Sequence, residues 1–292
     1  PALTTIRRQF GEHAFGTMSG ILTAMGQMGT LCASMPLKFL ADTLHWRIVF
    51  LLIGGISLLL SAGCWIFIPH SAPPARQRSL PVNTSKQAPS LWKICLTPSC
   101  FSLVLWFFLA GGTRLSFQSL WASRFLTQAL DYSEQTSSFF LLVISLGCII
   151  GPICLGLVSD RAGSFFTVGV STLLFSAVWL CLSLLSPGAP AWTTILLAFA
   201  FGAFGSGSFT IGFSCLRRFS RPQNSGILTG INNCFAFLGS ACFTQASGIF
   251  MEYSSGLGAQ EQYRILLMAF SALCLAATAL VVFFNRSALR KS

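Results

Sequence analysis

The sequence predicts an all-α membrane protein. Only 9% of its 292 residues are charged, whereas 53% are hydrophobic and 28 are Phe. A soluble domain of this size carries far more charge, because its surface must face water. The apolar residues gather in runs of about 20, the length that a helix needs to cross roughly 30 Å of hydrocarbon. Most of the outside of the protein is therefore expected to face lipid.

Eight such runs are predicted to form transmembrane helices. In chain order they are Phe15–Leu37, Ile48–Ile68, Ser99–Phe125, Ser138–Val158, Phe165–Leu185, Ala191–Phe213, Gly226–Phe250 and Ile265–Phe284. The dipeptide Thr97-Pro98 marks the start of the third helix, because Pro suits the first helical position. The even number of helices places both ends of the chain on the same side of the membrane.

The basic residues divide the connections between these helices into two sides. Thirteen lie on one side: Arg7, Arg8, Arg76, Arg78, Lys86, Lys93, Arg161, Arg217, Arg218, Arg221, Arg286, Arg290 and Lys291. Four lie on the other: Lys38, Arg47, Arg124 and Arg264. Lys and Arg accumulate on the cytoplasmic side of membrane proteins. The bias therefore predicts a multi-pass protein of the cytoplasmic (inner) membrane with both termini of this chain in the cytoplasm.

A polar segment separates the first two helices from the other six. Residues 69-92 are rich in Pro and Ser, and five Pro lie between Pro69 and Pro89. Such a composition cannot build a core and is typical of a flexible linker. We therefore expect residues 1-68 to hold two transmembrane helices, residues 69-92 to form a cytoplasmic linker and residues 93-292 to form a six-helix bundle.

The chain offers no pattern for an enzyme, a metal site or nucleic-acid binding. Its eleven Cys lie singly in apolar segments without a C-x-x-C pair, and its three His have no ligand spacing. Such thiols are expected to be buried or to face lipid. No nucleophile and base, and no cofactor motif, can be assembled. The basic residues form no stripe that would contact nucleic acid. We therefore expect no enzymatic activity, no metal and no cofactor.

A repeated sequence indicates an internal duplication. SGILTA begins at Ser19 and SGILTG at Ser225, 206 residues later, and each copy follows an Arg-Arg pair. The copies open the first and seventh predicted helices. Six helices separate them, so both copies cross the membrane in the same direction. This is a parallel repeat whose axis lies along the membrane normal.

This organisation resembles the major facilitator superfamily, whose members carry two six-helix halves joined by a long cytoplasmic loop. The segment Gly156–Gly163, which reads GLVSDRAG, resembles the cytoplasmic loop signature of that family in its second-half position. The resemblance implies a two-bundle transporter fold with eight of twelve transmembrane helices present. Residues 1-68 would be the end of the N-terminal bundle. By repeat symmetry, about 110 residues and four helices would be missing before it.

The same loop is a candidate conformational gate, formed by Gly156, Asp160, Arg161 and Gly163. We expect Asp160 to cap the N-terminal end of the following helix, while Arg161 meets helix carbonyls or the other half. The family resemblance favours a latch for one conformation of alternating access. The alternative is a capped turn whose Arg only sets the topology.

Arg114 is the charged residue predicted to lie deepest in the membrane. It follows Pro98 by about 24 Å at 1.5 Å per residue, which places it beyond the midplane and below the outer headgroups. Gln118 and Trp121 follow at i+4 and i+7, so the three residues are expected to share one helix face. An arginine at membrane depth is costly unless it faces a wet cavity, where it could bind an anion bidentately. The alternative is an anchor that extends to the outer interface beside Trp121; both readings stay open.

Two amides occupy equivalent positions in the repeat, Gln27 and Asn233. Each could contact a solute near the axis between the halves, although hydrogen bonding between helices is the simpler explanation. Asn232 competes with Asn233 for the inward position. Elsewhere, Ala198, Gly202 and Ser206 repeat at four-residue spacing, which predicts close packing of helices.

We therefore expect a secondary active transporter that moves a small organic solute by alternating access, with that solute and the lipid bilayer as partners. Arg114 and the absence of a predicted mid-membrane carboxylate favour an anionic solute. The aromatic-rich helices favour, as an alternative, a proton-coupled multidrug efflux transporter. In a different class, the chain is a non-transporting remnant or a membrane binding or sensing protein. The missing N-terminal helices are then a possible partner, supplied as a separate segment.

Overall fold

The computed structural model describes residues 15–32, 40, 43–67, 95–219 and 225–286. This part of the chain is helical and contains no strand, so the all-α prediction is confirmed. The chain divides into two compact units, which are Pro1–Met28 with Leu91–Ser292, and Gly29–Ser90. The predicted linker, 69-92, lies outside the described residues, as does the end of the first predicted helix beyond Cys32.

The smaller unit contains helix α4 (Trp46–Phe67). It begins directly after His45, which has a φ of 68° and accepts a hydrogen bond from the backbone N–H of Ile48 at 3.1 Å. The helix is apolar along its length and satisfies the length and composition of a membrane span. The second predicted helix is thus confirmed, and it starts two residues earlier than Ile48.

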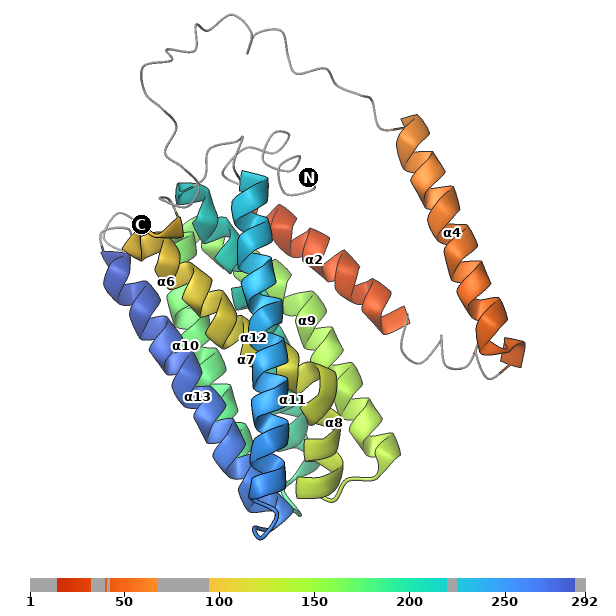
Figure 1. Cartoon of the computed structure of the whole chain (residues 1–292), viewed down its shortest axis with the longest axis vertical. Coiled ribbons are helices and arrows are strands. Elements are labelled where there is room, and N and C mark those ends of the chain that lie inside the picture. The colour runs from red at the N-terminus through yellow and green to blue at the C-terminus, as the bar shows by residue number, and fades with distance from the viewer. Residues whose placement is uncertain (1–14, 33–39, 41–42, 68–94, 220–224, 287–292) are drawn as a thin grey trace, which may run out of the picture. The chain divides into compact units, whose positions relative to one another are not determined.

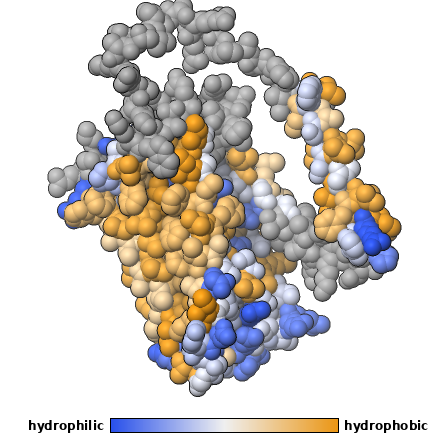
Figure 2. Space-filling view, viewed as in Figure 1, coloured by the Kyte–Doolittle hydropathy of each residue, from blue (hydrophilic) through white to orange (hydrophobic). Residues whose placement is uncertain are grey.

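The larger unit contains the first part of α2 and six long helical segments (Figure 1). Their bounds are α2 (Phe15–Cys32), a composite helix from Pro98 to Ala129, α9 (Glu134–Ala162), α10 (Ser164–Ser183), α11 (Ala191–Cys215) with the 3₁₀ turn η5 (Leu216–Arg218), α12 (Ser225–Tyr253) and α13 (Ala259–Phe284). The six long segments and α4 make seven candidate membrane spans among the described residues. The described part of α2 is helical but does not belong to these seven. Figure 2 shows apolar side chains over most of the visible face of this bundle.

The composite helix consists of α6 (Pro98–Trp106), η2 (Phe107–Gly111), α7 (Gly112–Ser116), η3 (Phe117–Trp121), α8 (Ala122–Arg124) and η4 (Phe125–Ala129). The three η segments are π turns, in which the backbone bonds reach one residue further than in an α-helix. It begins at Pro98, as the sequence predicts. It is the most buried of the spans, because α9, α11, α12 and α13 contact it and Trp106 reaches Thr172 of α10.

An aromatic core fills the space between this composite helix, α10 and α11. Phe117 lies 5.0 Å from Trp179 and 5.3 Å from Phe201, measured between ring centroids. The indole N–H of Trp106 donates to the hydroxyl of Thr172 at 3.1 Å. Rings of this size give the helices a large area of van der Waals contact.

The closest helix pair is α9 with α11, as the small-residue pattern predicts. A Cβ at Gly202 would overlap the backbone carbonyl oxygen of Ile144, so no other residue fits there. Pro152 lies inside α9 and has no N–H for the carbonyl of Cys148, one turn before it. The hydroxyl of Ser206 in α11 donates to that carbonyl at 3.3 Å instead. The proline is thus accommodated by the neighbouring helix.

Candidate functional site

The Arg114 side chain is almost completely buried, with 4% exposed. Its stem lies against Gly205 of α11, where an added Cβ would be 3.0 Å from the Arg114 Cδ. Its Cζ lies 5.5 Å from the centroid of the Phe209 ring. The Nε atom has no hydrogen-bond partner. Among the described residues, the contact offered to this positive charge is therefore the face of one aromatic ring, a cation–π interaction.

Arg114 lies at the middle level of the bundle. Gly205 and Phe209 belong to the central part of α11. Two residues before Arg114, an added Cβ at Gly112 would lie 2.7 Å from the backbone of Gly239, at the centre of α12. The side chain therefore does not extend to the outer interface beside Trp121, as the anchor alternative requires.

The predicted common face of Arg114, Gln118 and Trp121 is wrong. Arg114 packs on α11, whereas the amide nitrogen of Gln118 reaches the Cys148 Sγ of α9 at 3.8 Å. Trp121 faces the ring of Tyr263 in α13, with centroids 6.3 Å apart. The π turn at residues 117–121 changes the rotation per residue, so α-helical spacing does not apply. Arg114 therefore contacts α11 and Gln118 contacts the neighbouring helix α9, whereas Trp121 faces α13.

The two amides of the repeat are both partly exposed. Gln27 lies on α2 and Asn233 on α12, and each has intermediate burial. Asn232 takes the buried position, with its Nδ2 donating to the Leu228 carbonyl at 2.8 Å and its Oδ1 without a partner. Of the neighbours Asn232 and Asn233, only Asn233 therefore has a partly exposed side chain.

At the candidate gate, Asp160 does not cap the following helix, contrary to the prediction. Helix α9 continues to Ala162, and Gly163, with a φ of 86°, precedes α10 without a side-chain cap. Because Asp160 therefore lies in the last turn of α9, its carboxylate points to another helix. Its Oδ2 accepts hydrogen bonds from the Thr17 backbone N–H at 2.9 Å and from the Thr17 hydroxyl at 2.6 Å. Gly156 is buried in α9, and Arg161 is exposed.

The Asp160 contact is part of a longer interface of α2 with α9 and α11. A Cβ at Gly20 would overlap the backbone carbonyl of Pro152. The Thr210 hydroxyl of α11 donates to the Thr23 hydroxyl at 3.3 Å. Sequence reasoning missed this interface. The signal was available in the spacing of Thr17, Gly20 and Thr23, which places small residues at every third position of one helix.

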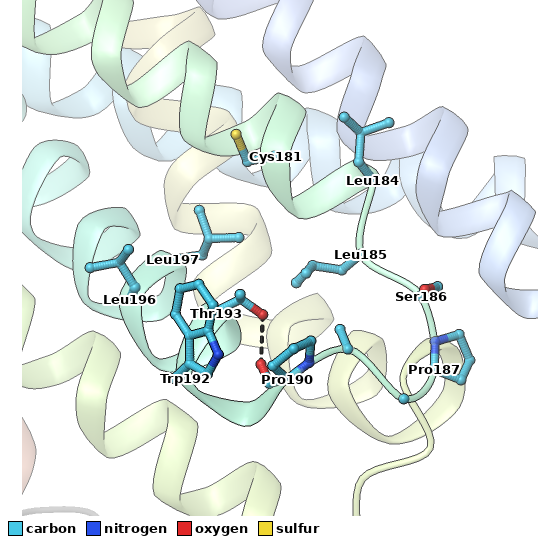
Figure 3. A pocket seen from close by; sticks show the side chains of 12 residues that line it. Cys181, Leu184, Leu185, Ser186, Pro187, Pro190, Trp192, Thr193, Leu196 and Leu197 are labelled. Atoms are coloured by element: carbon cyan, nitrogen blue, oxygen red, sulfur yellow. Dashed lines mark hydrogen bonds between the residues drawn. The ribbon is translucent and has the colours of Figure 1, made fainter.

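Two cavities among the described residues do not include Arg114 in their lining. A surface pocket of about 640 Å³ is formed by the connection between α10 and α11, and Leu185, Trp192 and Leu197 belong to its lining (Figure 3). In it the Thr193 hydroxyl donates to the Pro190 carbonyl at 2.6 Å. No charged side chain lines it. No cluster of three metal-ligating side chains occurs in the described part of the chain.

Comparison with known proteins finds one matching sequence family and solved structures of similar fold. A sequence model described as "Major Facilitator Superfamily" matches residues 1–241 and, in a second match, residues 103–292. Among solved structures, the chain is similar to the crystal structure of a bacterial homologue of the iron transporter ferroportin in an outward-facing state, with a TM-score of 0.53 and 17% sequence identity. That similarity covers 69% of this chain and 48% of the other. The chain thus spans about half the length of the matched transporter, and the likeness concerns the fold alone.

Proposed function

Because the chain belongs to the major facilitator superfamily, we propose that it acts in the secondary transport of a small organic anion across the cytoplasmic (inner) membrane. Transport would proceed by alternating access between two bundles, the second of which is formed by residues 93-292. Membership of this family supports a transporter in a membrane rather than an enzyme.

The buried guanidinium of Arg114, which has no ion-pair partner among the described residues, carries the proposal of an anionic solute. An arginine at the centre of a membrane helix costs about 3 kcal/mol on insertion scales, and such a group is stable when it is paired. The ring of Phe209 supplies only part of that compensation. A carboxylate or phosphate would accept two parallel hydrogen bonds from the guanidinium. We therefore assign Arg114 as the main contact of the solute.

Three amides complete the proposed solute site. Gln118 is close to Arg114 in sequence and lies against the neighbouring helix α9. Gln27 and Asn233 are partly exposed on α2 and α12 and are proposed to contact polar groups of the solute. Trp121, packed against Tyr263, is proposed to hold the composite helix in place rather than to touch the solute.

The contact between Asp160 and Thr17 is proposed to be the gate. A carboxylate that accepts backbone and hydroxyl hydrogen bonds in the first turn of α2 is favoured by the positive end of that helix. The positive-inside rule assigns this end of the bundle to the cytoplasm. Opening toward the cytoplasm would then require α2 to separate from α9 and α11, and Arg161 and the glycines of the signature would form the moving turn.

Proton-coupled multidrug efflux is less well supported. Aromatic side chains such as Phe117, Trp179 and Phe201 pack on one another in the core and so are not free to line a path for lipophilic drugs. A non-transporting role, in binding or sensing a solute at the membrane, predicts binding without flux.

The test is uptake into proteoliposomes that contain the purified protein. The probes are labelled succinate, glycerol 3-phosphate and shikimate, with uncharged succinamide as the analogue without charge. We expect uptake of at least one anion and a loss of at least about tenfold in Arg114→Gln. Arg264→Gln is the matched control, because Arg264 is a surface residue paired with Glu261 at 3.5 Å.

Each other outcome contradicts a defined part of the proposal. Normal anion uptake by Arg114→Gln would rule out the role of Arg114. Proton release on addition of lipophilic cations, without anion uptake, would indicate drug efflux. Binding of an anion without any flux would indicate the non-transporting alternative.

A further inference from the structure

We infer that the protein is an obligate anion exchanger, in which the bundles change conformation only with an anion bound at Arg114. The inference rests on the proposed function and adds that the movement of one anion is coupled to the return of another. It follows from three observations on the described residues: the position of the charged groups in the bundle, the fixed stem of Arg114 and the missing counter-charge.

The described acidic side chains all lie at helix ends or in connections. They are Asp131, Glu134, Asp160, Glu252 and Glu261. A proton-coupled carrier needs a titratable group that is exposed to each side of the membrane in turn, and carboxylates inside the membrane serve this purpose. The described helices offer no carboxylate at the level of Arg114. Coupling through a carboxyl proton therefore has no support in this part of the chain.

Arg114 cannot easily withdraw its charge to water. Long basic side chains relieve their burial by extending to the interface, but the stem of Arg114 is held in the bundle. The absence of a side chain at Gly205 provides its space, since a Cβ there would lie 3.0 Å from the Arg114 Cδ and 2.9 Å from the Phe175 ring. In this structure the guanidinium thus lies near the middle of α11.

As far as the described residues form it, the empty site therefore carries a positive charge without an ion-pair partner, and a bound anion would supply that partner. When both ends of the pathway close, water that solvates the empty guanidinium is expelled and the charge becomes more costly. A bound carboxylate or phosphate cancels that cost. The barrier to conformational change is then lower for the loaded carrier. Insertion scales for arginine imply a difference of about 100-fold in rate, so flux in one direction requires an anion to return.

Exchange is tested with proteoliposomes loaded with labelled succinate, glycerol 3-phosphate or shikimate. They are diluted either into the same unlabelled anion or into an isotonic medium whose only anion is a bulky, impermeant sulfonate buffer. The membrane potential and the pH are clamped at equal values. We expect efflux to be about 100-fold faster with the unlabelled anion outside, and a pH gradient alone to give no acceleration.

Equal efflux in both media, or efflux driven by the pH gradient, would overturn obligate exchange while leaving anion transport intact. No efflux of any probe in either medium would instead count against the proposed function, and the exchange inference would fall with it. The two failures are therefore distinguishable.

A folding measurement tests the same inference without flux. In detergent and without the probe anions, Arg114→Gln should unfold at a temperature a few degrees higher than the native protein, because the variant removes an unpaired buried charge. Added glycerol 3-phosphate should raise the unfolding temperature of the native protein and not that of the variant. A lower unfolding temperature for Arg114→Gln, with no effect of the anion on either protein, would identify Arg114 as a structural residue and overturn the inference.

Discussion

At the scale of single residues, the chemistry of Arg114 is readable from the sequence, but its surroundings are not. Its place inside an apolar run predicts a costly charge near the membrane interior, and its 4% exposure agrees. The identity of the contacting ring, Phe209, depends on how α11 packs beside α7. That contact joins residues 95 positions apart, and no local pattern encodes it.

The amides show the same limit. The repeat points to the polar pair at residues 232 and 233, but it does not say which of them faces the core. The structure buries Asn232 completely and leaves Asn233 half-exposed. The choice is made by the rotation of α12 against the composite helix, where Gly239 meets Gly112. A close glycine contact of this kind fixes rotation and cannot be inferred from one helix alone.

Asp160 gives a prediction at this scale. Its two hydrogen bonds to Thr17 are charge-assisted, and Asp160→Asn weakens both. Because Asp160 is partly exposed, we expect a loss of only about 1 kcal/mol of unfolding free energy. The measurement is thermal unfolding in detergent. Asp131→Asn, in the connection before α9, is the control, and equal unfolding temperatures for the two variants would show that the contact with α2 contributes nothing.

At the scale of elements, hydropathy locates the helices but not the polar turns at their ends. The sixth predicted helix begins at Ala191 and the eighth ends at Phe284, as observed. Helix α9, however, begins at Glu134, before the predicted Ser138, because Ser133 caps it by accepting a hydrogen bond from the Thr136 N–H at 3.3 Å. A capping signal marks that start and apolarity does not.

The π turns of the composite helix are the largest departure from the predicted elements. A π turn costs local hydrogen-bond geometry and is kept where packing requires it. Here the rings of Phe107, Phe117 and Phe125 sit in those turns and contact the aromatic core. The consequence reaches the site, since Gln118 and Trp121 turn to different helices. The α-helical periodicity of the sequence alone cannot predict this change of helix face.

Helix α2 gives the prediction at the scale of elements. Gly20→Val places a branched side chain against the Pro152 carbonyl and should push α2 away from α9. We expect several-fold less disulfide formation between the engineered pair Thr23→Cys and Thr210→Cys, whose hydroxyl oxygens are 3.3 Å apart in the native protein. The measurement is the yield of oxidative cross-linking in membranes, with the other cysteines replaced by Ser.

Gly26→Val is the matched control on the same helix, because a Cβ there meets nothing within 4 Å. Its cross-linking yield should equal that of the parent. Equal yields for Gly20→Val and Gly26→Val would mean that the close contact of Gly20 with Pro152 is not needed to hold α2 beside α9 and α11.

At the scale of the whole molecule, the duplicated pattern carries the fold assignment. The second SGIL copy opens α12 at Ser225, and the first lies in the early part of α2. The family match confirms the fold class that this repeat indicates. The pairing of α2 with α9 and α11 was not predictable, because it depends on contacts between segments far apart in the chain, such as Thr17 with Asp160, which are 143 residues apart.

The orientation of the molecule in its membrane is a sequence prediction that labelling can decide. Thirteen basic residues against four favour a cytoplasmic position for the turn at Arg161, for the linker and for the carboxyl end. The exposed residue Ser186, in the connection after α10, then lies on the opposite side, because α10 crosses the membrane between them. In intact cells an impermeant maleimide should label Ser186→Cys readily. Arg161→Cys, Ser79→Cys and Ser292→Cys should react only after permeabilisation. If Ser79→Cys and Ser292→Cys react from opposite sides, an odd number of helices separates them, and the parallel repeat on which the two-bundle fold rests cannot hold.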